Sequence, residues 1–148
     1  MHKTNKKIVF TVINDLSYDR RMHRICSELN KTGYQVTLIG RKLQNSKPFS
    51  STNFNTVRLN CWFNKSVFFY AEYNIRLFFL LLFKDFDIYG AVDLDTILPN
   101  FFVSRLKRKP LTYDAHEYFT EVIEIQQKPL VKKTWKAIEK FVLTKPNI

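Results

Sequence analysis

A histidine stands between carboxylates in the segment Asp114-Ala115-His116-Glu117. An imidazole beside carboxylates can take up, release or pass on a proton near neutral pH. The segment follows the short run 110–113, which is typical of a strand, so it would lie at a strand's carboxyl end, where ligands bind in open parallel sheets. The alternative is a structural histidine tied to a loop carbonyl. The position favours a catalytic His116, with Asp114 and Glu117 beside it.

Two further carboxylates, Asp93 and Asp95, follow the apolar run 87–92. Carboxylates two residues apart can bind sugar hydroxyls or contribute to a metal site. A third carboxylate at ligand spacing is lacking, so we predict no metal. We expect Asp93 to bind hydroxyl groups. For Asp95, N-capping of the helix that follows is an equal alternative.

A third polar loop, 14–21, follows the first apolar run and begins with Asn14 and Asp15. Arg20 and Arg21 fall in the first turn of the predicted helix that comes next. Unpaired backbone N–H groups and two guanidinium groups would together form an anion site. The alternative is that both arginines are solvated and merely offset Asp19.

The loops can meet only if the elements before them form one parallel sheet, and the periodicity predicts such elements. The expected strands are 7–13, 35–39, 56–60, 87–92 and one starting at 110. The expected helices are one from 19 to about 32, 66–84, 95–107 and one starting at 129. Ser17 is a plausible N-cap of the first helix and Gly33 its C′ residue. Pro99 fits its helix only in the first turn.

Alternating strands and helices predict an α/β fold. We expect a Rossmann-like, doubly wound parallel sheet of about five strands in the order 3-2-1-4-5, with helices on both faces. The 148 residues would form a single domain. All three polar loops then lie along one edge of the sheet, which we interpret as the functional edge.

Composition excludes several functional classes. The chain has three glycines and contains neither a P-loop nor a GxGxxG motif. Cys26 and Cys61 cannot build a disulfide framework or a zinc site, and free thiols fit a cytoplasmic protein. No secretory signal is recognisable, because the apolar run after the basic start leads at once into Asn14 and Asp15. No resident cofactor is predicted.

The charge balance favours anionic partners. Lys and Arg number 24 against 13 Asp and Glu, a formal net charge of +11. No nucleic-acid-binding motif appears, so we predict no nucleic-acid partner. The apolar segment 67–83 is interrupted by polar residues and should cover the sheet rather than span a bilayer. An interfacial helix on an anionic membrane, with Lys65 and Lys84 at its ends, is the alternative.

Three segments carry a resemblance to a known family. KIVFTVINDLSYDRRMHRICSELNKTGYQVTLIGR, DIYGAVDLDTILP and LTYDAHEYFTEV resemble the N-terminal domain of bacterial family 4 glycosyltransferases, which have two Rossmann-like domains in the GT-B arrangement. The resemblance runs from Lys7 to about Leu143, and the YDAHEY segment is its most specific part.

The resemblance implies transfer of a sugar from a nucleotide-sugar donor to a lipid-linked or glycan acceptor, in cell-envelope polysaccharide synthesis. Asn14 and Asp15 would lie in the loop that approaches the donor phosphates, and Asp93 would face the acceptor. His116 matches the family's histidine that touches the transferred sugar, and Asp114 and Glu117 would shape its loop. The enzyme would work in the cytoplasm, or on the inner face of the cytoplasmic membrane.

In this family, the donor nucleotide is held by a C-terminal domain that residues 1–148 do not include. We therefore expect an incomplete enzyme that is inactive by itself. It would need the missing C-terminal domain or a partner chain to turn over. The alternative is a non-catalytic module that binds anionic lipid at a membrane surface.

Overall fold

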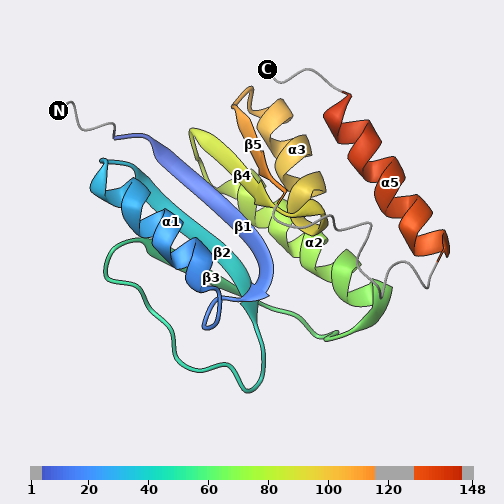
Figure 1. Cartoon of the computed structure of the whole chain (residues 1–148), viewed down its shortest axis with the longest axis horizontal. Coiled ribbons are helices and arrows are strands. Elements are labelled where there is room, and N and C mark those ends of the chain that lie inside the picture. Colours follow the sequence, from blue (N-terminus) through green and yellow to red (C-terminus); the bar gives the residue numbers. More distant parts are fainter. Residues whose placement is uncertain (1–4, 116–128, 145–148) are drawn as a thin grey trace.

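Five parallel strands form a single sheet in the order β3-β2-β1-β4-β5 (Figure 1). The computed structural model describes residues 5–115 and 129–144. The strands are β1 (Lys7–Asp15), β2 (Gln35–Lys42), β3 (Asn55–Asn60), β4 (Ile88–Val92) and β5 (Leu111–Asp114). The helices are α1 (Arg20–Lys31), α2 (Ser66–Phe83), α3 (Ile97–Leu106) and α5 (Pro129–Leu143), with a 3₁₀ turn η1 (Leu94–Thr96). The predicted fold class and strand order are confirmed.

β1 is the central strand. It pairs in parallel with β2 from Lys7 to Thr11 and with β4 from Ile8 to Thr11. Side chains on both of its faces are buried, which explains its β-branched, apolar sequence. After Thr11 the register with β2 shifts, and pairing resumes at Asp15. The strand is thus longer than the predicted 7–13, and its end turns towards the loop that precedes α1.

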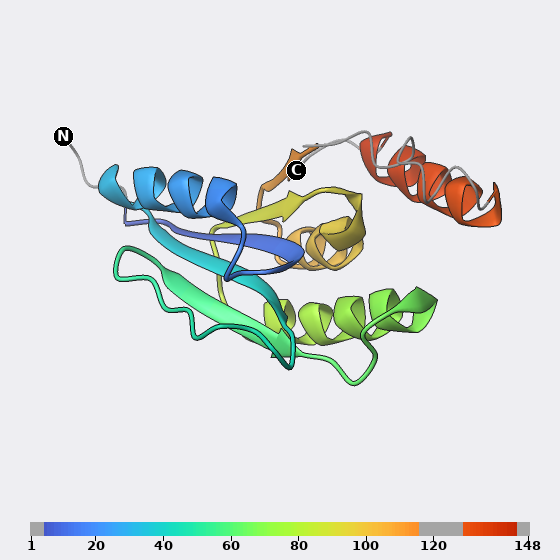
Figure 2. The ribbon, with the colours of Figure 1, turned by 60° about the horizontal axis from the view of Figure 1, so that its bottom comes forward.

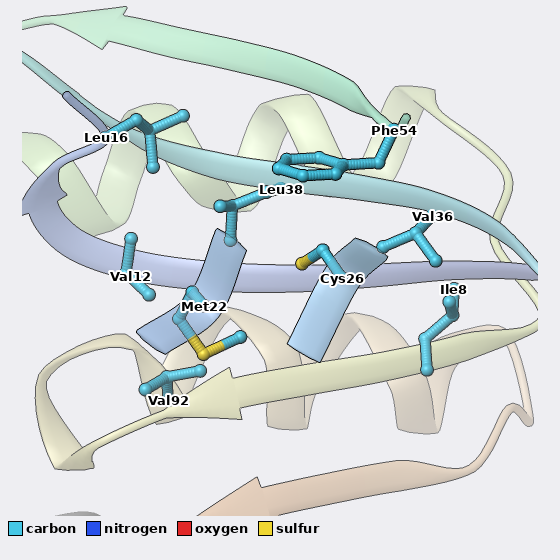
Figure 3. Packing of buried hydrophobic residues seen from close by; sticks show 9 residues of the cluster. All are labelled: Ile8, Val12, Leu16, Met22, Cys26, Val36, Leu38, Phe54 and Val92. Atoms are coloured by element: carbon cyan, nitrogen blue, oxygen red, sulfur yellow. The ribbon is translucent and has the colours of Figure 1, made fainter. Parts of the chain in front are cut away.

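The helices lie on both faces of the sheet (Figure 2). α1 covers one face, where its residues Met22 and Cys26 pack into the cluster shown in Figure 3, which includes Ile8, Val12 and Leu38. α2 and α3 cover the other face and contact each other. The inward row of α2 packs there against Val9 and Tyr89. The helix after β1 and the helix after β4 lie on opposite faces of the sheet. This arrangement opens a crevice between these two strands.

The ends of the first and third helices test the predicted caps. The N-cap of α1 is Asp19, whose Oδ1 accepts the N–H of Met22 at 3.0 Å, so the predicted cap Ser17 is wrong. Ser17 instead donates to the carbonyl of Lys47. Gly33 ends the helix with a φ of 100°, as a C′ glycine does. Pro99 lies in the first turn of α3, where its missing N–H costs no helical bond.

Gly40 of β2 gives a test of how closely the sheet and the β1–α1 loop pack. A Cβ atom at this position would lie 2.8 Å from the carbonyl oxygen of Asn14 and would overlap the side chain of Leu16. We expect Gly40→Ala to lower the free energy of unfolding by about 1–3 kcal/mol, because the loop must shift away from the strand. Urea denaturation measures this, and unchanged stability would contradict the packing.

Candidate functional site

A cleft of about 680 Å³ opens at the carboxyl ends of β1 and β4. Its walls come from the end of β1, the first residues of α1 and the turn after β4. Five residues predicted for the site line it together: Asn14, Asp15, Arg20, Arg21 and Asp93. Asp95 lines it as well. The predicted loop 14–21 and the segment of Asp93 and Asp95 therefore meet, as a parallel sheet requires.

The predicted segment Asp114–Glu117 is only partly described. Asp114 ends β5, and its carboxylate forms an ion pair with the guanidinium of Arg21. The catalytic prediction for His116, and that for Glu117, lie outside the described residues. The ion pair nevertheless links the first turn of α1 to the end of β5, two residues before His116.

The two arginines of α1 have different surroundings. Arg21 is paired with Asp114, so its charge is already largely compensated. Arg20 lies at the cleft with its side chain exposed, and no ion pair or hydrogen bond joins its guanidinium to another described residue. Arg20 is therefore the better placed of the two to meet an anion at the helix N-terminus.

Asp15 has a structural role that the sequence did not reveal. Its Oδ1 accepts from Arg58 Nη2 at 2.7 Å and from the N–H of Ser17 at 3.0 Å, while its Oδ2 accepts from the hydroxyl of Ser46. The side chains of Asp15 and Arg58 are only 5% and 12% exposed. Burial alone would raise the pKa of Asp15, but the hydrogen bonds from Ser46 and Ser17 and the charge of Arg58 lower it.

The hydrogen bonds around Asp15 also fix β3 and the loop after β2. Arg58 of β3 also donates to the carbonyl of Lys47, and Ser46 accepts the N–H of Leu43. The ends of β1 and β3 and the loop after β2 are thereby joined around one carboxylate. This carboxylate positions the cleft wall, and that role occupies both of its oxygens.

Asp93 has a strained backbone. Its φ of 61° and ψ of 170° lie in a region that is essentially restricted to glycine. Its N–H donates to the carbonyl of Asp114 at 2.9 Å, which joins β4 to β5 at their carboxyl ends. A non-glycine residue held in such a conformation at the edge of a cleft is typical of functional sites.

The burial of Asp95 is a feature that the sequence did not predict. Asp95 is 5% exposed, and its Oδ1 has no hydrogen-bond partner. It does not cap α3, whose N-cap is Thr96 without a side-chain bond. Burial, together with the negative charge of Asp93, raises the pKa of Asp95 to about 8. At neutral pH this carboxyl group therefore holds a proton.

The turn that carries Asp95 is held by a buried polar network. Asn74 of α2 donates to the carbonyl of Asp95 at 2.9 Å, and the Thr96 hydroxyl bonds to the carbonyl of Thr11 at 3.1 Å. Asn100 of α3 donates to the Thr11 hydroxyl at 2.6 Å. These bonds join η1 to α2 and to β1, and they join α3 to β1. In the sequence, these residues are polar positions inside apolar segments. One sequence alone does not show whether such a polar position is buried or exposed.

Within residues 5–115 and 129–144, no group of three His, Cys, Asp or Glu side chains could hold a metal ion. What the described cleft offers is a pair of carboxyl groups, one of them protonated, and a guanidinium group at a helix N-terminus. Such a set can bind hydroxyl groups on one side and an anionic group on the other.

Comparison with known proteins shows the fold. No protein-family model and no curated protein matches the sequence. Among solved structures, the C-terminal domain of a hydrogenase from Pyrococcus furiosus matches with a TM-score of 0.57 and 14% identity, covering 78% of this chain and 94% of that domain. UDP-GlcNAc 2-epimerase from Methanocaldococcus jannaschii matches with a TM-score of 0.48 and 14% identity, covering 87% of this chain and 36% of the enzyme. At 14% identity, the likeness to the hydrogenase domain shows the fold alone, a Rossmann-like α/β domain.

The ion pair of Asp15 and Arg58 can be tested by removing one partner. We expect Arg58→Ala to lower the free energy of unfolding by about 3 kcal/mol, because it leaves a buried carboxylate without its counter-charge. Arg24→Ala removes an exposed arginine of α1 and should change stability by less than about 0.5 kcal/mol. Urea denaturation of both variants measures the difference. Equal stabilities would contradict a structural role for the pair.

The protonated state of Asp95 predicts a pH dependence. In the unfolded chain Asp95 ionises near pH 3.8, whereas the folded protein keeps its proton up to about pH 8. The contribution of Asp95 to stability should therefore fall across this range as pH rises. We expect the free energy of unfolding of Asp95→Asn to increase relative to that of the wild type by up to about 1.4 kcal/mol for each pH unit between these limits. Above them, the difference should stay constant.

Thermal unfolding at a series of pH values measures this gain. The control is Asp85→Asn, which changes a carboxylate whose side chain is 93% exposed. A constant difference between Asp95→Asn and the wild type from pH 4 to pH 8 would show that Asp95 is ionised in the fold.

Proposed function

We propose that this chain is the acceptor-side, Rossmann-like domain of a GT-B glycosyltransferase. The enzyme would transfer a sugar from a nucleotide-sugar donor to a lipid-linked or glycan acceptor. The single observation that supports this most is the cleft of about 680 Å³, in which Asn14, Arg20, Asp93 and Asp95 meet at the carboxyl ends of β1 and β4. The sequence resemblance suggests the family, and a cleft at the carboxyl ends of parallel strands is a position suited to substrate binding.

The acceptor would be held by the carboxyl groups of the turn after β4. Carboxyl oxygens accept hydrogen bonds from sugar hydroxyls, and a protonated carboxyl group also donates one. Asp93 would then accept from an acceptor hydroxyl, and Asp95, which is protonated at neutral pH, would complete the pair. A neutral Asp95 also avoids placing two negative charges beside each other in the same cleft.

The donor would be bound by the wall of the cleft that the end of β1 and the start of α1 form. Arg20 at the first turn of α1 would attract the phosphates of a nucleotide-sugar, and Asn14 would lie beside them. His116 and Glu117 remain predictions for the catalytic step, since they lie outside the described residues. Asp114, which is paired with Arg21, would act by fixing the start of their segment.

One Rossmann-like domain supplies only one wall of a GT-B active site. The nucleotide would be held by a second such domain, in the same polypeptide or in another chain. We therefore expect residues 1–148 alone to bind an acceptor glycan and not to turn over a nucleotide-sugar.

The test is binding of the chain to an immobilised panel of bacterial oligosaccharides, followed by saturation-transfer NMR with any that bind. We expect Asp93→Asn to weaken binding about tenfold or more, because a charge-assisted hydrogen bond to a hydroxyl group is lost. The control, Asp85→Asn, removes an exposed carboxylate in the loop before β4 and should bind like the wild type. Failure of the wild type to bind any oligosaccharide, or equal binding by both variants, would contradict the proposal.

A further inference from the structure

α2 is an apolar helix with only one side covered. Its inward row, Phe69, Tyr73, Leu77 and Leu81, is buried against the sheet. Its outward row, which we call the outer stripe, consists of Phe68, Ile75, Phe79 and Phe83, exposed by 67%, 58%, 51% and 81%. A helix that is apolar all round is normally covered all round. The outer stripe therefore needs an explanation that the fold of the described residues does not provide.

The apolar surface extends beyond α2. At the start of the helix, Trp62 and Phe63 are 84% and 50% exposed. On α3, Phe102 and Leu106 are 49% and 67% exposed. An apolar groove of about 210 Å³ lies between the two helices, lined among others by Phe79 and Phe102. Extended patches of this kind on a soluble domain mark interaction sites.

The two charged residues of α2 neutralise each other. The Glu72 carboxylate accepts from Arg76 Nε at 2.7 Å and from the N–H groups of Trp62 and Phe63, each at 2.9 Å. The Arg76 guanidinium lies 4.7 Å from the centre of the Trp62 ring. These contacts hold Trp62 at the end of the outer stripe, and they remove the net charge that would oppose transfer of the stripe to an apolar phase.

Positive charge borders this surface. Lys65 and Lys84 stand exposed at the two ends of α2. The neighbouring helix α5, which packs on α3 through Phe141, exposes three lysines and contains a single carboxylate, that of Glu139. The exposed lysines of α5 are Lys133, Lys136 and Lys140. The surface thus combines exposed aromatic and aliphatic side chains with an exposed lysine at each end of α2, and α5 adds exposed lysines next to α3.

We propose that the outer stripe of α2, continued by Phe102 and Leu106 of α3, docks on an anionic lipid bilayer. Aromatic and aliphatic groups would enter the headgroup region, and the bordering lysines would meet lipid phosphates. Charge argues against a second copy of this chain as the occupant, because each copy carries a formal charge of +11. The proposal does not rest on the proposed glycosyltransferase function, because a different face carries it.

Docking here means lying along the surface. α2 has 18 residues and a mean hydropathy of 1.4, which in length and composition would suffice for a membrane span. Its inward row, however, closes the core of the sheet, and extracting the helix would expose Tyr73, Leu77 and Leu81 together with Val9 of β1. A bilayer can therefore reach the outer stripe only from the side.

The experiment is co-sedimentation of the chain with vesicles of phosphatidylcholine alone and of phosphatidylcholine mixed with phosphatidylglycerol. We expect binding to the mixed vesicles, weakening as salt is added, and a blue shift of Trp62 fluorescence on binding. Phe79→Ser combined with Phe83→Ser should weaken binding to the mixed vesicles about tenfold or more, because two rings no longer leave water. Lys133→Gln combined with Lys136→Gln should weaken it and flatten its salt dependence.

The matched control is Tyr18→Ser, which removes an aromatic ring that is 64% exposed in the loop before α1 and outside the stripe. It should bind vesicles like the wild type, and circular dichroism checks that all variants are folded. Absence of binding to the mixed vesicles at low salt would overturn the proposal. So would equal binding by the double phenylalanine variant. A dimer in solution that the same variant dissociates, without vesicle binding, would assign the stripe to a second copy instead.

Discussion

The arrangement of this domain depends on the burial of β1 on both faces and its pairing along both edges. A strand in this position can meet solvent only at its ends. From the carboxyl end of β1 the chain continues to α1 on one face of the sheet, whereas from β4 it continues to α3 on the other face. The crevice that results is a consequence of right-handed crossovers on opposite sides of the sheet. Polar residues that follow β1 and β4 therefore line this crevice.

The cleft at this position is asymmetric in charge. On the β1 side, the negative charge of Asp15 is cancelled by Arg58, and Arg20 remains as an exposed cation. On the β4 side, Asp93 and Asp95 lie close enough for the charge of one to raise the pKa of the other. The acidic surroundings reach Tyr113 of β5, where burial and then Glu139, Asp93 and Asp95 raise the pKa to about 12. One wall of the cleft thus presents the exposed guanidinium of Arg20 beside Asp19, and the other presents the carboxyl groups of Asp93 and Asp95.

Periodicity was sufficient to predict the strands, their order and the edge at which the site lies, because buried β-branched runs and helical spacing act locally. It could not distinguish the two roles open to Asp95, because burial of that carboxyl depends on bonds that join η1 to Asn74 of α2 and to Thr11 of β1. The pairing of Asp15 with Arg58 joins residues 43 positions apart, and nothing local marks either partner. Asp19 and Ser17 are both good capping residues, and their types alone could not show that Asp19 caps α1.

The ion pair between Arg21 and Asp114 has a consequence for how the two ends of the cleft communicate. Arg21 lies in the first turn of α1 at the cleft, and Asp114 is the last residue of β5. An anion that competes for Arg21 frees the carboxylate of Asp114 by the same act, and a fixed Asp114 in turn makes Arg21 less available to that anion. Binding of an anion by Arg21 and pairing of Arg21 with Asp114 are thereby reciprocal, as linked equilibria must be.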